Sequence, residues 1–150
     1  MTSPGEPKTY QRPRFHHALN VVTTGLTRAG LIPRSYVLTT VGRRSGQARR
    51  NPVTVVELDG TRWLVAPYGV VPWVLNARAA GEVRLTRRFS TTRYAVREVG
   101  PDEAGPVLKE YVTVASVPRP YFVSTVDDPP EAFAREAAGH PVMELVPVDG

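Results

Sequence analysis

The dipeptide Asp59-Gly60, placed between two strand-like runs, most strongly limits the folds open to this chain. The runs on either side, 53–58 and 61–66, are rich in β-branched and apolar residues, which favour strands. Asp-Gly is a preferred sequence for a two-residue hairpin turn, because both positions tolerate positive φ. Consecutive strands joined in this way pair antiparallel, so the sequence argues against a doubly wound parallel sheet.

Further strands and helices surround this hairpin. Residues 14–29 are expected to form a helix, because Phe15, Leu19, Val22 and Leu26 repeat at helical spacing. We expect further strands at 36–41, 82–88, 91–99 and 142–148, and helices at 73–80, 102–115 and 131–138, with Asp102 as a cap. This order predicts an α+β fold, a small barrel of about six mostly antiparallel strands with flanking helices. A flexible leader at 1–12 and a single domain at 13–150 complete the expected organisation.

Basic residues are concentrated in the first part of the chain. Between Pro7 and Val56 there are nine Lys or Arg residues and no Asp or Glu. The segment Gly42–Pro52, GRRSGQARRNP, holds four arginines and two glycines just after a strand-like run, and we expect the arginines to share one turn. Arginine forks match phosphate and carboxylate oxygens, and glycine brings backbone N–H groups close to a ligand. The segment predicts a local anion site for a nucleic acid, a lipid headgroup or a cofactor tail.

Composition limits the compartment and the chemistry. The chain has no cysteine, so disulfides, thiolate metal sites and cysteine nucleophiles are excluded. No apolar run approaches the roughly 20 residues that span a bilayer, and the polar leader lacks the apolar core of a signal peptide. We therefore expect a cytoplasmic protein.

The sequence shows no catalytic motif of its own. Phosphate-binding and dinucleotide-binding glycine motifs are absent, and Ser45 lacks the spacing of a nucleophile elbow. His16, His17 and His140 have no acidic cluster beside them, so we expect solvated or capping histidines and no metal site. Any redox chemistry is therefore expected to belong to a bound cofactor.

Two blocks of sequence resemble a known family. Residues 38–53, LTTVGRRSGQARRNPV, resemble the signature of the deazaflavin-dependent nitroreductases, also called coenzyme F-420-dependent quinone reductases. Residues 72–81, PWVLNARAAG, resemble the second block of that family, P-x-W-x-x-N-L-x-A-N-P. The resemblance implies an FMN-binding-like split β-barrel and an oxidoreductase that uses coenzyme F-420, with FMN as the alternative cofactor. The Arg-, Ala-, Val- and Pro-rich composition also resembles that of actinobacterial proteins.

The resemblance implies a cofactor site, residue by residue. The phosphate and acidic tail would be held by Arg43, Arg44, Ser45, Gly46 and Arg49. The ring system would lie over Pro52 and against the segment formed by Ala66, Pro67, Tyr68 and Gly69. Trp73 and Asn76 would close the pocket, although core packing for Trp73 and a structural hydrogen bond for Asn76 are alternatives. An apolar slot for the ring is expected from Val53, Val55, Val65 and Trp73.

The acceptor side of the site is less defined. Tyr68 stands where many members of the family carry a lysine, so it could stack in that position. Tyr111, Tyr121 and Phe122 fall in the region that shapes the substrate pocket in the family. A tyrosine there could donate a proton to the reduced substrate, which makes Tyr68, Tyr111 and Tyr121 the catalytic candidates. Plain core packing is the alternative for each, and the catalytic residue stays unassigned.

Four functions remain open. The leading one is hydride transfer from reduced coenzyme F-420 to a small-molecule electron acceptor, such as a quinone, an activated alkene or a nitroaromatic. A non-catalytic carrier of the same cofactor is the second. A nucleic-acid-binding protein is the third, which the absence of any nucleic-acid motif argues against. Peripheral membrane contact through helix 14–29 is the fourth, because its apolar stripe has basic flanks. The oligomeric state is left open.

Overall fold

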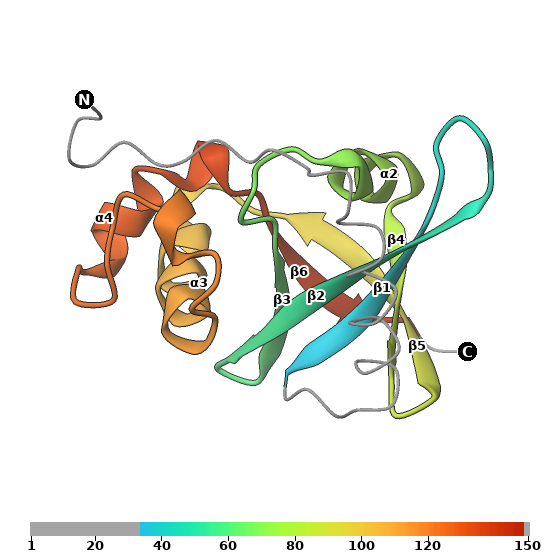
Figure 1. Cartoon of the computed structure of the whole chain (residues 1–150), viewed down its shortest axis with the longest axis horizontal. Helices are drawn as coiled ribbons and strands as arrows, with labels where there is room; N and C mark the ends of the chain where they lie inside the picture. The colour runs from blue at the N-terminus through green and yellow to red at the C-terminus, as the bar shows by residue number, and fades with distance from the viewer. Residues whose placement is uncertain (1–33, 149–150) are drawn as a thin grey trace.

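The structure, a computed structural model, describes residues 34–148 (Figure 1). The expected leader at 1–12 and helix at 14–29 lie outside the described residues, so both stay predictions, as does membrane contact through that helix. Among the helices within 34–148, none is long and apolar enough to cross a membrane.

Six strands form a closed barrel in the order β1-β2-β3-β6-β5-β4. Their bounds are β1 (Ser35–Val41), β2 (Ala48–Leu58), β3 (Thr61–Val65), β4 (Glu82–Arg87), β5 (Ser90–Glu98) and β6 (Val142–Pro147). Every neighbouring pair is antiparallel, including the β1–β4 pair and the two pairs made by β6. The predicted barrel is confirmed, and the turn at Asp59-Gly60 has positive φ at both residues.

Helices cover one end and one side of this barrel. Their bounds are α2 (Pro72–Ala80), α3 (Pro101–Val114), η1 (Arg119–Tyr121), α4 (Pro130–Ala134) and η2 (Ala137–Gly139). Figure 1 shows α2 across the upper end, and α3 and α4 beside the barrel. Asp102 does not cap α3: Gly100 is the N-cap, and Asp102 lies in the first turn. Pro101 explains the shift, because proline is favoured at the first helical position, where its missing N–H costs nothing.

Two hydrophobic cores hold these layers together. The first fills the barrel and includes Trp73, Val74 and Ala77 of α2, which pack against Leu38 and Leu64. Helix α2 therefore closes one end of the barrel with its own apolar face.

The second core lies between the outside of the barrel and the C-terminal helices. Val56, Trp63 and Val65 point outward from β2 and β3, and they pack with Leu108 of α3 and Phe133 of α4. Because side chains alternate along a strand, β2 and β3 supply both cores at once. This second core fixes the C-terminal segment against β3 and the loop that follows it.

Strand β2 begins earlier than the sequence predicts. Residues 48–52 continue the ladder with β1, and Ala48 pairs with Val41. Only residues 42–47 form the turn, so the expectation of four arginines on one turn is wrong: Arg49 and Arg50 belong to the strand. The low β-propensity of this polar stretch is overridden by pairing along the whole length of β1.

Candidate functional site

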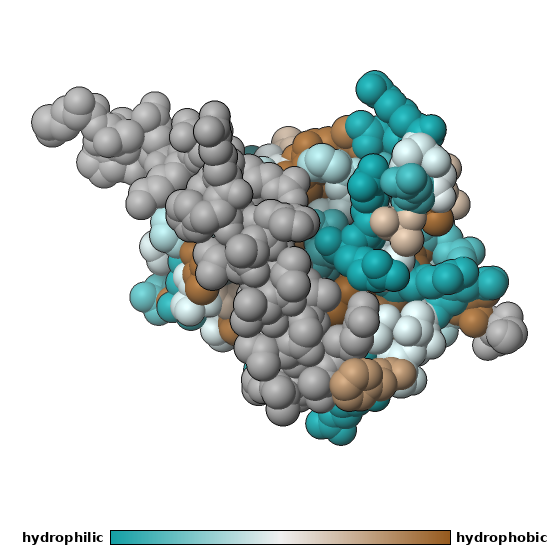
Figure 2. Space-filling model, turned by 45° about the vertical axis from the view of Figure 1, so that its right-hand side comes forward, coloured by the Kyte–Doolittle hydropathy of each residue, from teal (hydrophilic) through white to brown (hydrophobic). Residues whose placement is uncertain are grey.

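The β1–β2 turn presents cationic side chains on a backbone that is closed by its own hydrogen bonds. Gly42 N–H donates to Gln47 O at 2.8 Å, and Gly46 N–H donates to Gly42 O at 2.8 Å, which closes the turn. Ser45 Oγ accepts a hydrogen bond from Gln47 N–H at 3.2 Å. Gly46 has φ 71°, a conformation that favours glycine. Figure 2 shows hydrophilic side chains at the projecting upper end of the molecule, where Figure 1 places this hairpin.

Arg49 lies on β2, but its guanidinium group lies close to the turn. A Cβ built on Gly42 would come within 2.6 Å of Ser45 Oγ and 3.7 Å of Arg49 Nε. Arg49 therefore folds back over the turn beside Ser45, whereas its neighbour Arg50 points to the other face of the strand. Within residues 34–148, Arg43, Arg44, Arg49 and Arg50 form no ion pair, whereas Arg62, Arg78, Arg93 and Arg97 each do.

Asn76 joins this turn to helix α2. Its side chain is 3% exposed, and its Oδ1 accepts hydrogen bonds from Arg43 N–H at 3.2 Å and from Arg43 Nη1 at 3.0 Å. Its Nδ2 donates to Thr40 Oγ1 at 3.3 Å. Asn76 is therefore a buried hydrogen-bonding residue that orients Arg43, as the alternative interpretation of the sequence had it.

The segment after β3 is held by the C-terminal part of the chain. Ala66 is fully buried, and its N–H donates to Pro141 O at 2.8 Å. Gly69 has φ 91°, and its N–H donates to Ala66 O at 3.3 Å. Pro67, Tyr68 and Gly69 are half-buried, so their surface stays accessible at the same end of the barrel as α2.

The predicted apolar slot is not formed as expected. Val55 and Trp73 are buried inside the barrel, and Val53 packs against that core. Val65 instead faces outward into the second core, because it is adjacent to the inward-facing Leu64 and Ala66 on β3. Trp73 is only 8% exposed, so its main contact is the barrel interior. Pro52, on β2 opposite Val37, keeps partial exposure.

The three candidate tyrosines differ in their surroundings. Tyr68 and Tyr121 meet edge to face, with ring centroids 4.8 Å apart. Both are half-buried, so each retains contact with solvent. Tyr111 is 5% exposed within the second core, and burial raises the pKa of its hydroxyl, with the nearby Tyr68 as a second cause. Tyr111 therefore stays protonated and lies beneath the surface that Tyr68 and Tyr121 form.

His140 is the functional candidate that the sequence did not identify. It is 6% exposed, so it is not a solvated histidine, but it is the C-cap residue of η2, and its backbone N–H donates to Ala137 O at 3.1 Å. The expectation for His16 and His17 lies outside the described residues. The Nδ1 atom of His140 lies 2.8 Å from Pro67 O, and its Nε2 atom lies 3.2 Å from Glu136 Oε1. The Glu136–His140 spacing of four residues was a signal in the sequence, but their partner Pro67 is far away along the chain. No group of three or more His, Asp or Glu side chains within 34–148 could hold a metal ion.

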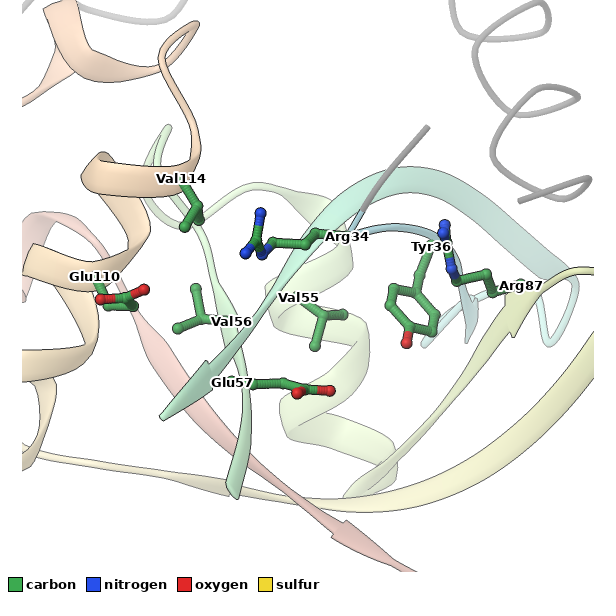
Figure 3. Close-up of a pocket in the computed structure, with 8 residues that line it drawn as sticks. All are labelled: Arg34, Tyr36, Val55, Val56, Glu57, Arg87, Glu110 and Val114. Atoms are coloured by element: carbon green, nitrogen blue, oxygen red, sulfur yellow. The ribbon is translucent and has the colours of Figure 1, made fainter. Parts of the chain in front are cut away.

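Two cavities lie away from these residues. One, of about 350 Å³, is bounded by α3 and by the strand residues drawn in Figure 3, where Tyr36 and Arg87 lie across from Glu110 and Val114. The other, of about 380 Å³, shares Tyr36 and Arg87 with the first. Of the residues predicted to contact the cofactor, only Val55 of the expected slot lines one of these two cavities. The accessible ones lie on the β1–β2 turn, on β2 and in the segment 67–69, whereas Ala66, Trp73 and Asn76 are buried.

The donor set of this surface fits an anionic group better than a metal. Arg44 and Arg49 are exposed and without carboxylate partners in the described part of the chain, and Ser45 and Gly46 complete the turn beside them. Guanidinium groups bind phosphate and carboxylate oxygens through charge-assisted hydrogen bonds. A cofactor with a phosphodiester and carboxylate tail matches this chemistry.

Comparisons with solved structures support the fold. A structure described as an F420-H2 dependent reductase (FDR-A) is 23% identical, with a TM-score of 0.54, over 75% of this chain and 94% of that chain. A chain described as a domain-swapped dimer is 21% identical, with a TM-score of 0.56, over 88% and 93%. HutZ, the haem storage protein from Vibrio cholerae, is 10% identical, with a TM-score of 0.53, over 78% and 83%. At these identities the likeness establishes a shared barrel fold.

The family itself follows from the sequence match. The family model described as F420H(2)-dependent quinone reductase matches residues 12–126, which include the β1–β2 turn, the segment 66–69 and α2. A search of the curated proteins gave no match. The chain belongs to this family of coenzyme F-420-dependent quinone reductases and is therefore an F-420-dependent oxidoreductase.

Proposed function

We propose that this chain transfers a hydride from reduced coenzyme F-420 to a small electrophilic acceptor, of the quinone, activated-alkene or nitroaromatic class. The observation that carries the proposal is the cluster of exposed Arg44 and Arg49 beside Ser45 at the β1–β2 turn, which α2 holds through Arg43 and Asn76. Within residues 34–148, neither Arg44 nor Arg49 forms an ion pair. Such a cluster, in a member of this family, is suited to a polyanionic cofactor tail.

Each part of the surface has a separate task in this proposal. Arg44, Arg49, Ser45 and Gly46 bind the phosphate and carboxylates of the tail, and Arg43 contributes from its position on Asn76. The ring lies over Pro52 and against the segment Ala66–Gly69. Trp73 supports that end of the barrel from within its core rather than by direct contact. The reduced deazaflavin, when bound, supplies the hydride, and the protein supplies the binding and orientation.

Reduction of the acceptor also requires a proton. Tyr68 and Tyr121 are half-buried and in mutual contact, so they combine solvent access with a fixed orientation. Tyr111 lies deeper and is held protonated by burial, which suits a supporting role behind them. We assign the proton donor to the Tyr68–Tyr121 pair, because a general acid must reach the substrate.

Cofactor binding and turnover test this proposal together. Quenching of tryptophan fluorescence on addition of coenzyme F-420 measures binding, and loss of the reduced cofactor's absorbance with a quinone, an enone or a nitroaromatic measures turnover. We expect both, and we expect Arg44→Ala to weaken binding while Arg135→Ala, at an exposed site on the C-terminal segment, does not. Absence of binding and of turnover with all acceptor classes would refute the proposal.

A non-catalytic carrier of the same cofactor is the second candidate. It predicts tight binding without reduction of any acceptor, and the same two measurements separate it from the enzyme. FMN in place of coenzyme F-420 would show as stronger quenching by FMN. DNA binding would show as an affinity that falls steeply with salt, because counterions are released from the phosphate backbone. Sedimentation with liposomes, with and without residues 1–30, tests the predicted membrane contact.

A further inference from the structure

The His140 imidazole is enclosed between two hydrogen-bond acceptors. Pro67 O is a carbonyl oxygen and can only accept, so the Nδ1 atom 2.8 Å away carries a proton. The Nε2 atom lies 3.2 Å from Glu136 Oε1, a distance at which a proton must lie between the two atoms for the contact to be favourable. A second proton, on Nε2, therefore lets His140 donate to Pro67 O and Glu136 Oε1 at once.

Two backbone N–H groups hold the Glu136 side chain in place. Its Oε1 accepts a hydrogen bond from Val123 N–H at 3.0 Å, and its Oε2 accepts one from Ser124 N–H at 2.8 Å. These two bonds fix the carboxylate group beside the imidazole. Burial lowers the pKa of His140, and the contacts with Pro67 O and Glu136 oppose this effect without reversing it. The Nε2 proton is therefore lost as the pH rises through a value below the usual range of histidine.

The imidazole is also held in one orientation. Phe122 stacks on it, with ring centroids 3.9 Å apart and an angle of 18° between the planes. Phe122 in turn packs against Tyr111 of α3 and Phe133 of α4. Within residues 34–148, the further titratable side chains around this cluster are the phenols Tyr111, Tyr68 of the loop and Tyr121 of η1. In the same part of the chain, the charged group in contact with the imidazole is Glu136.

Three contacts make residues 139–141 a support for the segment 66–69. His140 Nδ1 donates to Pro67 O, Ala66 N–H donates to Pro141 O, and Gly139 O lies 3.6 Å from a Cβ built on Gly69. The segment 66–69 is the one against which the cofactor ring is proposed to pack. Its backbone position therefore depends on a histidine and a glutamate that lie beyond residues 12–126, the part that the family model matches.

We propose that His140 is a positioning residue for the cofactor: it fixes the Pro67 carbonyl, and the second proton, which it donates to Glu136, makes the strength of that hold depend on pH. The hold is strongest when the imidazole is doubly protonated, because Glu136 then anchors the ring from the other side. This inference rests on the proposed function, since it concerns the same surface.

Matched variants separate the hydrogen bond from the titration. His140→Asn keeps an amide N–H for Pro67 O but carries no titratable proton, and His140→Ala removes both. Binding of coenzyme F-420 to the full chain is measured by fluorescence from about pH 5 to about pH 8, a range that extends below the ordinary histidine pKa of about 6.5. Any pH dependence of affinity that comes from titration of the cofactor itself also appears in His140→Asn. The difference between the pH profiles of wild type and His140→Asn is therefore due to His140.

The expected results differ for each variant. As the pH falls, the affinity of wild type for coenzyme F-420 should rise about three- to ten-fold more than that of His140→Asn. This is the change in affinity that one hydrogen bond produces. His140→Ala should bind about three- to ten-fold more weakly than His140→Asn at every pH. Equal pH profiles for wild type and His140→Asn would contradict the claim that a titratable proton on His140 controls binding. Wild-type affinity in His140→Ala would contradict the positioning role of His140.

A measurement without cofactor distinguishes failure of this inference from failure of the proposed function. Long-range proton–nitrogen NMR of the cofactor-free chain should show His140 protonated at Nδ1 throughout and titrating at Nε2, and Glu136→Gln should shift that titration. A neutral form protonated at Nε2 instead would overturn the inference irrespective of any cofactor. If the NMR result is as expected but neither wild type nor any variant binds coenzyme F-420, the proposed function is refuted. The role of His140 in positioning the cofactor is then refuted as well.

Discussion

Asn76 holds Arg43 by two hydrogen bonds to the same oxygen: its Oδ1 accepts the Arg43 backbone N–H at 3.2 Å and the Nη1 atom at 3.0 Å. The side-chain amide of a helix that closes the barrel thus fixes both the path and the charge of the β1–β2 turn. Because Asn76 is buried and Arg43 is exposed, these bonds are partly buried, and losing the Asn76 amide also leaves the buried Thr40 Oγ1 without this partner.

Asn76→Ala should therefore lower both stability and cofactor affinity. We expect a loss of about 1–3 kcal/mol in the free energy of unfolding, since Thr40 Oγ1 and the Arg43 N–H each lose a partner. Urea unfolding measures the first effect and cofactor fluorescence the second. Ala79→Ser, at an exposed position of the same helix, is the control. If Asn76→Ala unfolds like wild type, Asn76 does not hold the turn.

Arg49 and Arg50 should differ in their effect on cofactor binding, although they are adjacent. Arg49 lies over the turn near Ser45, and Arg50 points to the other face of β2. We expect Arg49→Ala to weaken binding of coenzyme F-420 by about ten-fold or more, the loss of one charge-assisted bond, and Arg50→Ala to change it little. Fluorescence titration at fixed ionic strength decides this. Equal losses in both variants would indicate a diffuse electrostatic attraction rather than a specific site.

Gly42→Ala should disturb the turn through a steric contact. The added Cβ would lie 2.6 Å from Ser45 Oγ and 3.2 Å from Gln47 O. We expect a loss of about 1–3 kcal/mol in the free energy of unfolding, the usual cost of forcing a group into packed space. Adding Ser45→Ala should restore part of it, because the closer of the two contacts is removed. Urea unfolding of the two single variants and the double variant tests this, and strict additivity would contradict it.

Tyr111 should make the protein sensitive to alkali. Burial raises the pKa of Tyr111 above its ordinary value, so its neutral form is favoured in the folded state. The stability that this pKa difference contributes is fully present below about pH 10, the pKa of tyrosine in the unfolded chain. It is lost as the pH rises toward the pKa of Tyr111 in the folded protein. Unfolding measured from about pH 9 to about pH 11 should show a weaker decline for Tyr111→Phe than for wild type. Parallel declines in the two proteins would show that Tyr111 ionises as easily folded as unfolded.

Local signals in the sequence were sufficient for most of the fold. The Asp59-Gly60 turn, the strand-like runs around it and Gly81 after α2 were each placed correctly, because turn chemistry and alternation depend on neighbouring residues. The start of β2 was wrong, because a polar stretch became a strand by pairing with β1. Val65 was assigned to the wrong core, because its face is set by the register of β3 between two other strands.

The sequence by itself determined the barrel, the family and the arginine-bearing hairpin, since each rests on residues close together in the chain. The tertiary structure decided which of those residues act together. Closure of the barrel through β6 places His140 beside Pro67, which is 73 positions away, and packing of α2 places Asn76 beside Arg43, 33 positions away. No local pattern encodes such distances, because they depend on how the strands and helices pack once they have formed.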